Sequence, residues 1–122
     1  MSVGTFCLVL HSHLPWLARH GRWPVGEEWL HQAWAQSYLP LTRLLRRLGE
    51  DGGRDLLTLG ITPVLAAQLD DPYCKAEHQR WLSDWMLRAD DLAGDRDPTV
   101  SALGRYEGAR ARDTLLEMTS AW

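Results

Sequence analysis

The residues LVLHSHLPW, numbers 8–16, hold the pattern that decides the fold of this 122-residue chain. They close an apolar run, TFCLVL at residues 5–10, of the kind expected for a strand covered on both faces. Two histidines one residue apart follow this run, and then a proline and a tryptophan. Residues 11–26 combine prolines, glycines and histidines, and this composition predicts a structured loop.

The segment after this loop is predicted to be helical. Glu27 and Glu28 suit a first turn, where carboxylates face the positive end of the helix dipole. Pro40 is expected to kink or break the helix because it removes a backbone N–H and crowds the preceding turn. Leucines at helical spacing continue beyond it, and Gly49 is the expected stop.

A second buried strand is predicted at residues 56–60, LLTLG. Thr62 followed by proline indicates a helix cap with proline at the first helical position. Two further helices are predicted at residues 75–92 and 101–120. This order of strand, long loop, helix, strand and helices implies a parallel layout, so the predicted fold class is α/β.

Composition narrows the class of protein. The chain carries 13 basic and 16 acidic residues, a formal charge of −3 that gives no reason to expect nucleic acid. No apolar stretch approaches the roughly 20 residues of a membrane span, and a signal-peptide pattern is not recognisable, so we expect a cytoplasmic location.

Cys7 and Cys74 are far apart, and both are predicted to be reduced thiols in or near the core.

Tryptophan is unusually frequent, with seven residues beside one phenylalanine. Trp81 and Trp85, four residues apart, are predicted to pack inward on one helix face. Trp16 and Trp23 lie in a stretch without helical or strand period, and flat amphipathic indoles of this kind suit stacking against sugar rings. These two side chains are therefore candidates for a carbohydrate site.

His11 and His13 follow the first apolar run, where chemistry gathers in parallel β/α folds. Side chains alternate along a strand, so both imidazoles should face the same side. Three interpretations remain open: buried polar groups satisfied by neighbours, ligands of zinc or a similar ion, and groups that hydrogen-bond sugar hydroxyls or a catalytic carboxylate. Against metal, no further histidine, aspartate or cysteine directly follows the second strand.

Three stretches carry a resemblance to a known family: HSHLPW at 11–16, GRWPVGEEWL at 21–30 and LTLGITPVLAAQL at 57–69. In this order and at these separations they resemble the opening of a family 57 glycoside hydrolase, most closely its α-1,4-glucan branching members. The resemblance implies that the chain is the N-terminal portion of a (β/α)7 TIM-like barrel, with residues 1–122 forming a truncated segment of the catalytic domain. It also implies glycogen or α-glucan metabolism.

The resemblance further implies that His11 and His13 line the sugar subsite beside the nucleophile, with Trp23 and Trp29 near the acceptor or donor groove. Trp16 is a further substrate-binding candidate through its stacking face. Retaining glycoside chemistry needs two carboxyl groups about 5 Å apart. In this family the nucleophilic glutamate and the acid/base aspartate lie in later blocks, beyond the end of this chain. We therefore expect no catalytic residue here, no activity of the chain alone, and no cofactor or metal.

Acidic residues within the chain offer no convincing substitute. Glu27 and Glu28 are interpreted as helix-dipole partners. The remaining adjacent pairs occur in solvated or helix-end contexts: Asp70 with Asp71, and Asp90 with Asp91. A complete barrel commonly takes about 250 residues. Two strands cannot close one, so we expect the chain to be a fragment whose partners are an α-glucan and the missing remainder of the barrel.

Other activities stay open. Within the family, 4-α-glucanotransferases and amylases share the first-block histidines, and the GRWPVGEEW stretch favours branching. A metal-dependent hydrolase built on the His-x-His pair and a non-catalytic glucan-binding module are alternatives of other classes.

Overall fold

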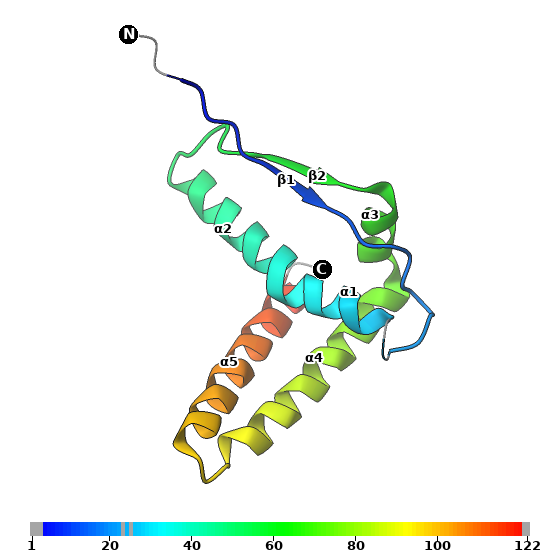
Figure 1. The fold of residues 1–122 in the computed structure, drawn as a ribbon, viewed down its shortest axis with the longest axis vertical. Helices are drawn as coiled ribbons and strands as arrows, with labels where there is room; N and C mark the ends of the chain where they lie inside the picture. Colours follow the sequence, from blue (N-terminus) through cyan, green and yellow to red (C-terminus); the bar gives the residue numbers. More distant parts are fainter. Residues whose placement is uncertain (1–3, 23, 25, 121–122) are drawn as a thin grey trace. The chain divides into compact units, whose positions relative to one another are not determined.

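The structure is a computed structural model that describes residues 4–120 except 23 and 25. The chain divides into two compact units, Met1–Asp71 and Pro72–Trp122. The first unit contains a parallel two-stranded sheet and short helices, and the second is a helical hairpin (Figure 1). The predicted α/β class is thus confirmed.

The sheet of the first unit pairs β1, Val9–Ser12, with β2, Thr58–Ile61, in parallel. The register places His11 opposite Gly60. Between the strands the chain forms α1, η1 and α2, and α3 follows β2 (Figure 1). Their bounds are Glu27–Ala33 for α1, Trp34–Tyr38 for the π-helical η1, Leu39–Glu50 for α2 and Pro63–Asp70 for α3.

Both strands begin later than the apolar pattern predicts. The first was expected at residues 5–10 and lies at Val9–Ser12, so His11 stands inside the strand and not beyond its end. The second was expected at 56–60 and lies at Thr58–Ile61. The reason is that pairing with the partner strand sets these bounds, whereas apolar composition reports only a tendency to be buried.

Within this chain the first apolar run is not covered on both faces, although its composition is typical of a covered strand. Phe6 is 86% exposed and Val9 is 66% exposed. Cys7 is also exposed, which contradicts its predicted place in or near the core, whereas Cys74 is buried as expected. The two strands leave these apolar side chains in contact with solvent.

Pro40 interrupts the helix in an unexpected way. The backbone changes from α-helix to the π-helical turn η1 before the proline, and α2 begins at Leu39 with Pro40 in its first turn. A π turn is one of the few ways in which a helix absorbs an irregular residue without ending. The predicted kink or break is therefore a local change of helical pitch. The helix ends at Glu50, one residue past the predicted stop at Gly49.

The cap predicted at the start of α3 is confirmed. The side chain of Thr62 accepts a hydrogen bond from the Leu65 backbone N–H at 3.4 Å, and Pro63 occupies the first helical position. This cap fixes where β2 gives way to helix. It thereby sets the direction in which α3 presents its buried residues, Leu65 and Gln68.

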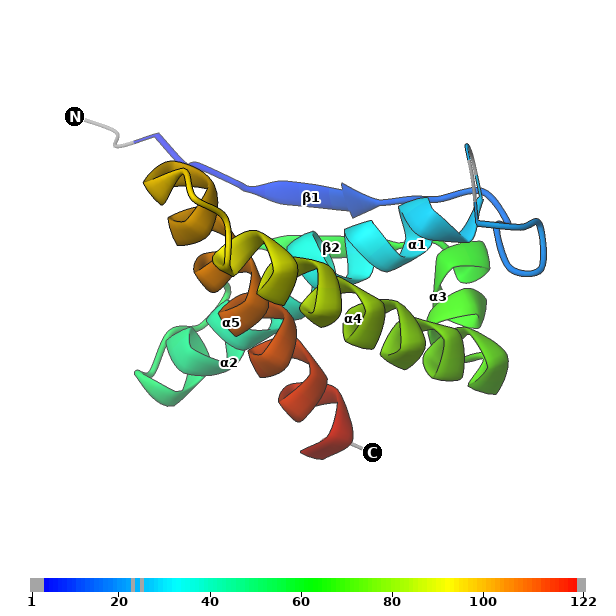
Figure 2. The ribbon, with the colours of Figure 1, turned by 90° about the horizontal axis from the view of Figure 1, so that it is seen from below.

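The second unit consists of α4, Pro72–Ala93, and α5, Pro98–Ser120, which are joined by a short turn and cross at an angle (Figures 1 and 2). Both helices were predicted, a few residues shorter at their N-termini. Gly104 lets them approach closely, because a Cβ there would lie 2.7 Å from the Ala89 carbonyl oxygen. On α4 the rings of Trp81 and Trp85 stack with centroids 5.6 Å apart, and Trp81 is buried, as the packing interpretation expects.

Across the described residues, no helix combines the length and apolar character needed to cross a membrane.

Candidate substrate site

The histidine pair lies on one side of the strand, as predicted. The imidazole of His11, inside β1, and that of His13, just beyond it, have centroids 6.2 Å apart and planes inclined by 17°. Both residues are exposed. This outcome excludes the interpretation of the pair as buried core histidines within this chain. It leaves two stacked imidazoles on residues that are exposed to solvent.

Gly60 makes room for this arrangement. It is the β2 residue opposite His11, and a Cβ built on it would lie 3.5 Å from His11 Nδ1. That distance is ordinary van der Waals contact, so alanine would fit and a branched side chain would not. The absence of a side chain at Gly60 therefore keeps one flank of the His11 ring open.

The loop after His13 is held by a single buried amide. Gln68 on α3 accepts hydrogen bonds through Oε1 from the backbone N–H of Leu17 at 2.6 Å and of Ala18 at 3.2 Å. Its Nε2 donates to the carbonyl oxygens of Pro15 at 2.9 Å and Val64 at 3.4 Å. The loop is thus anchored to the helix that follows β2.

A buried carboxylate holds the next part of the loop. Glu27 Oε1 accepts a hydrogen bond from the Arg19 backbone N–H at 2.6 Å, and the Glu27 N–H donates to the Gly21 carbonyl at 2.9 Å. Arg19 NH1 in turn lies 3.3 Å from Asp71 Oδ2. Glu27 stands in the first turn of α1, as predicted, and its side chain also bonds the loop.

Backbone geometry of the loop depends on glycine at two points. Gly21 has a φ of +82°, which L-residues with a side chain rarely adopt. Gly26 packs so closely against the Gly21 carbonyl that any Cβ there would collide with it. Two glycines and two buried polar side chains thus constrain the backbone at the described positions 15–21 and 26.

Two of the three tryptophans of the predicted site, Trp16 and Trp29, are about half exposed. Trp16 in the loop is 43% exposed, and Trp29 on α1 is 48% exposed. Half-exposed indoles of this kind present a face to solvent on which a sugar ring can stack. Trp23, the remaining predicted site residue, lies outside the described residues.

Sequence reasoning missed the roles of Gln68 and of the Glu27 carboxylate. One signal was available for Gln68, which is the polar member of the otherwise apolar stretch PVLAAQL and stands three residues after Leu65. That spacing places both on one helix face. A glutamine on the buried face of a helix needs hydrogen-bond partners, although the sequence does not say which.

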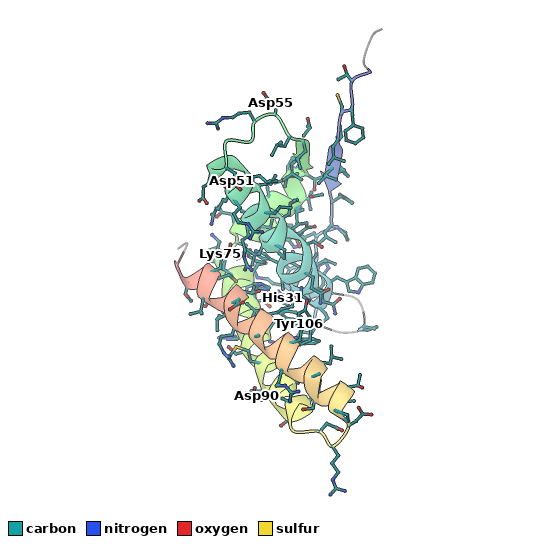
Figure 3. All side chains as sticks on the ribbon, turned by 90° about the vertical axis from the view of Figure 1, so that its left-hand side faces the viewer. His31, Asp51, Asp55, Lys75, Asp90 and Tyr106 are labelled. Atoms are coloured by element: carbon teal, nitrogen blue, oxygen red, sulfur yellow. The ribbon has the colours of Figure 1, made fainter. Side chains whose placement is uncertain are left out.

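Three acidic side chains outside this site lie at a turn or near a helix end. Asp51 and Asp55 are in the turn that joins α2 to β2, and Asp90 is near the end of α4 (Figure 3). Over the part of the chain that the structure describes, no three His, Cys, Asp or Glu side chains are grouped to hold a metal ion. The distinctive feature is therefore the exposed histidine pair, with an anchored tryptophan loop directly after it.

Over most of its length the chain is similar to glucan branching enzymes of the family 57 type. A probable 1,4-α-glucan branching enzyme of Mycobacterium tuberculosis is 59% identical over 103 residues, which are 84% of this chain and 20% of that protein. The 1,4-α-glucan branching enzyme of Thermococcus kodakarensis is 39% identical over 79 residues, 65% of this chain and 12% of that protein.

Solved structures give the same result. The crystal structure of a GH57-type branching enzyme from Pyrococcus horikoshii matches with a TM-score of 0.86 at 35% identity, covering 94% of this chain and 22% of that one. The Thermococcus kodakaraensis GH57 branching enzyme, in complex with glucose, matches with a TM-score of 0.77 at 33% identity, over 93% of this chain and 21% of that one. No protein-family model matches the chain.

The chain spans about a fifth of the length of the Mycobacterium tuberculosis and Pyrococcus horikoshii proteins. The predicted resemblance to the N-terminal part of a family 57 branching enzyme is thereby confirmed.

Proposed function

We propose that this chain forms the N-terminal part of an α-1,4-glucan branching enzyme and contributes to its substrate groove. The observation that carries the proposal is the 59% identity to a probable branching enzyme over 84% of the chain. In this proposal the exposed and stacked histidine pair forms the sugar subsite of that groove. The substrate is then an α-1,4-glucan such as amylose, a maltooligosaccharide or a glycogen-like polymer.

In this proposal β1 and β2 are the first two strands of a (β/α)7 barrel, and residues 1–122 are part of its catalytic domain. Their parallel pairing supports it, because barrel strands are parallel. The exposed apolar residues around the strands support it as well, since further strands and helices would cover them. The remainder of the barrel is thus the partner that this chain requires.

The reaction would proceed with retention of configuration. A nucleophilic carboxylate attacks the anomeric carbon of an α-1,4 link, the acid/base protonates the departing O4, and a covalent glucosyl-enzyme forms. The acid/base then removes the proton from a 6-hydroxyl of the acceptor glucan, which attacks the intermediate and yields an α-1,6 branch. In this proposal both carboxyl groups lie outside residues 1–122. The protein carboxyls supply the nucleophile and the proton, so the chemistry needs no cofactor.

The residues of this chain would bind and orient the donor glucan. His11 and His13 can donate and accept hydrogen bonds, which suits sugar hydroxyls next to the reacting carbon. Trp16, Trp23 and Trp29 would offer stacking faces along the groove. Holding the donor in one pose converts part of the binding energy into rate, because the reacting atoms are already aligned.

The test is product analysis with the complete gene product and amylose. The proposal expects new α-1,6 linkages, detected by their anomeric proton signal, without a matching rise in reducing ends. Redistributed α-1,4 chains without branches would identify a 4-α-glucanotransferase, and a rise in reducing ends alone would identify an amylase. Either result would overturn the branching assignment.

The half-exposed Trp16 and Trp29 favour one second candidate, a glucan-binding module without catalysis. It predicts maltooligosaccharide binding without any change in the linkages of the glucan. Binding that disappears with Trp16→Ala, together with unaltered amylose, would select the binding module over the enzyme.

A further inference from the structure

The side chain of Gln68 makes hydrogen bonds to the two peptide groups that flank Trp16. The Pro15 carbonyl belongs to the peptide group before Trp16, and the Leu17 N–H belongs to the peptide group after it. Both are bound by the one carboxamide of Gln68, at 2.9 Å and 2.6 Å. The two peptide groups that determine the backbone of Trp16 are therefore held by a side chain from α3.

The carboxamide has no spare capacity. Its oxygen accepts two backbone N–H groups and its nitrogen donates to two carbonyl oxygens, which uses both lone pairs and both protons. Gln68 is fully buried, so water cannot substitute for it without the loop moving. Among natural side chains of this length, glutamine alone offers two donor protons together with an acceptor oxygen, whereas a protonated glutamate offers one donor proton and an ionised glutamate offers none.

The Trp16 ring itself is 43% exposed, so packing constrains it less than a core side chain. The backbone at Trp16 therefore has a larger part in deciding where its indole can lie. The neighbouring Arg19 N–H is bound in turn by the Glu27 carboxylate, so the anchoring continues along the loop.

We propose that Gln68 is a positioning residue that fixes the Trp16 indole for stacking on the glucan next to the histidine pair. This inference rests on the proposed function, since it takes the ligand to be an α-glucan. Gln68 makes no contact with the glucan in this account. It acts by holding the turn from Pro15 to Ala18, and so reduces the ordering that binding would otherwise require.

The experiment measures maltohexaose affinity of the complete gene product at pH 8 and pH 5. Gln68→Leu removes all the anchoring bonds, and Gln68→Glu keeps the acceptor but, when ionised, sets a carboxylate against the Pro15 and Val64 carbonyl oxygens. Gln36→Leu and Gln36→Glu make the same chemical changes at an exposed glutamine of the same unit. Each affinity is expressed relative to the unmodified protein at the same pH.

We expect both Gln68 variants to weaken binding about tenfold or more at pH 8, which corresponds to about 1.4 kcal/mol, and the Gln36 variants to leave it unchanged. At pH 5 we expect the Gln68→Glu carboxyl to be protonated and to donate to Pro15 again, because burial and the facing Pro15 and Val64 carbonyl oxygens raise its pKa against the opposing effect of the Leu17 and Ala18 N–H groups. Its relative affinity should recover there, whereas that of Gln68→Leu should not. An equal loss at both pH values, or full affinity of Gln68→Glu at pH 8, would overturn the proposal.

Two further measurements separate this inference from the proposed function. If Trp16→Ala weakens binding and Gln68→Leu does not, the positioning role fails and the glucan site stands. If Trp16→Ala leaves affinity unchanged, the stacking role assigned to Trp16 fails. Amide hydrogen exchange tests the anchoring by itself. Gln68→Leu should increase the exchange rates of the Leu17 and Ala18 amides, and unchanged rates would contradict the anchoring role of Gln68.

Discussion

His11 on β1 and Gly60 on β2 are direct partners in the parallel register, and the missing side chain of Gly60 leaves space beside the His11 imidazole. The orientation of the His11 imidazole, a proposed ligand-binding group, therefore depends on the absence of a side chain at Gly60. This dependence predicts that the size of residue 60 affects glucan binding more than it affects folding.

Gly60→Val should displace the His11 ring, because its branched carbons extend beyond the point where a Cβ would already lie 3.5 Å from Nδ1. We expect maltohexaose affinity of the complete gene product to fall about tenfold. Gly60→Ala is the control and should bind almost normally. Equal affinity for the two variants would show that Gly60 does not govern the His11 position.

The close approach of α4 and α5 predicts a sharp contrast between two glycines. A side chain at Gly104 would collide with the α4 backbone at Ala93, so Gly104→Ala should destabilise the protein by about 1–3 kcal/mol through overpacking. Gly49 near the end of α2 has open space around its Cβ position, so Gly49→Ala should be neutral or stabilising by up to about 1 kcal/mol. Urea denaturation measures both, and destabilisation by Gly49→Ala alone would contradict the packing described here.

The metal-dependent alternative makes a clear prediction of its own. Structural and catalytic zinc sites use three or four protein ligands, and His11 and His13 supply two. We expect the chain to retain well under one zinc per molecule after reconstitution and gel filtration. One tightly held zinc that disappears in His11→Ala would establish the metal site and remove the glucan interpretation of the pair.

Exposed apolar residues around the strands predict self-association of the isolated 122-residue chain. Phe6 and Val9 are largely exposed, and both strands offer unpaired edges that favour intermolecular pairing. Sedimentation velocity should show species larger than the monomer. Val9→Lys should reduce them, whereas Leu103→Lys, at an exposed leucine on α5, should not. A cooperative melt of a monomer would count against this expectation.

Local chemistry explains what the sequence predicted well. The Thr62 cap, the two long helices and the shared side of His11 and His13 depend on neighbours within a few positions, and the structure has all of them. The α/β class follows from the order of the same elements. The fragment interpretation required the family resemblance, because composition alone does not say what covers an exposed strand.

Features that depend on distant partners were not predictable in the same way. The bounds of β1 follow from its pairing with β2, about fifty positions away, and the apolar run gave no measure of that register. Gln68 binds Leu17 across a separation of 51 residues. The π-helical turn before Pro40 reflects how one helix accommodates a missing N–H, for which the proline indicates the place but not the form.

The central claim is that this chain supplies part of a glucan groove while the catalytic carboxylates lie outside residues 1–122. A retaining enzyme forms a covalent glucosyl intermediate, so a 5-fluoro-α-glucosyl fluoride should trap the nucleophile of the complete gene product. Peptide mass mapping of the trapped protein should place the sugar on a residue beyond Trp122. A label on Glu27, Glu28 or any other residue of this chain, or no covalent adduct at all, would contradict the account.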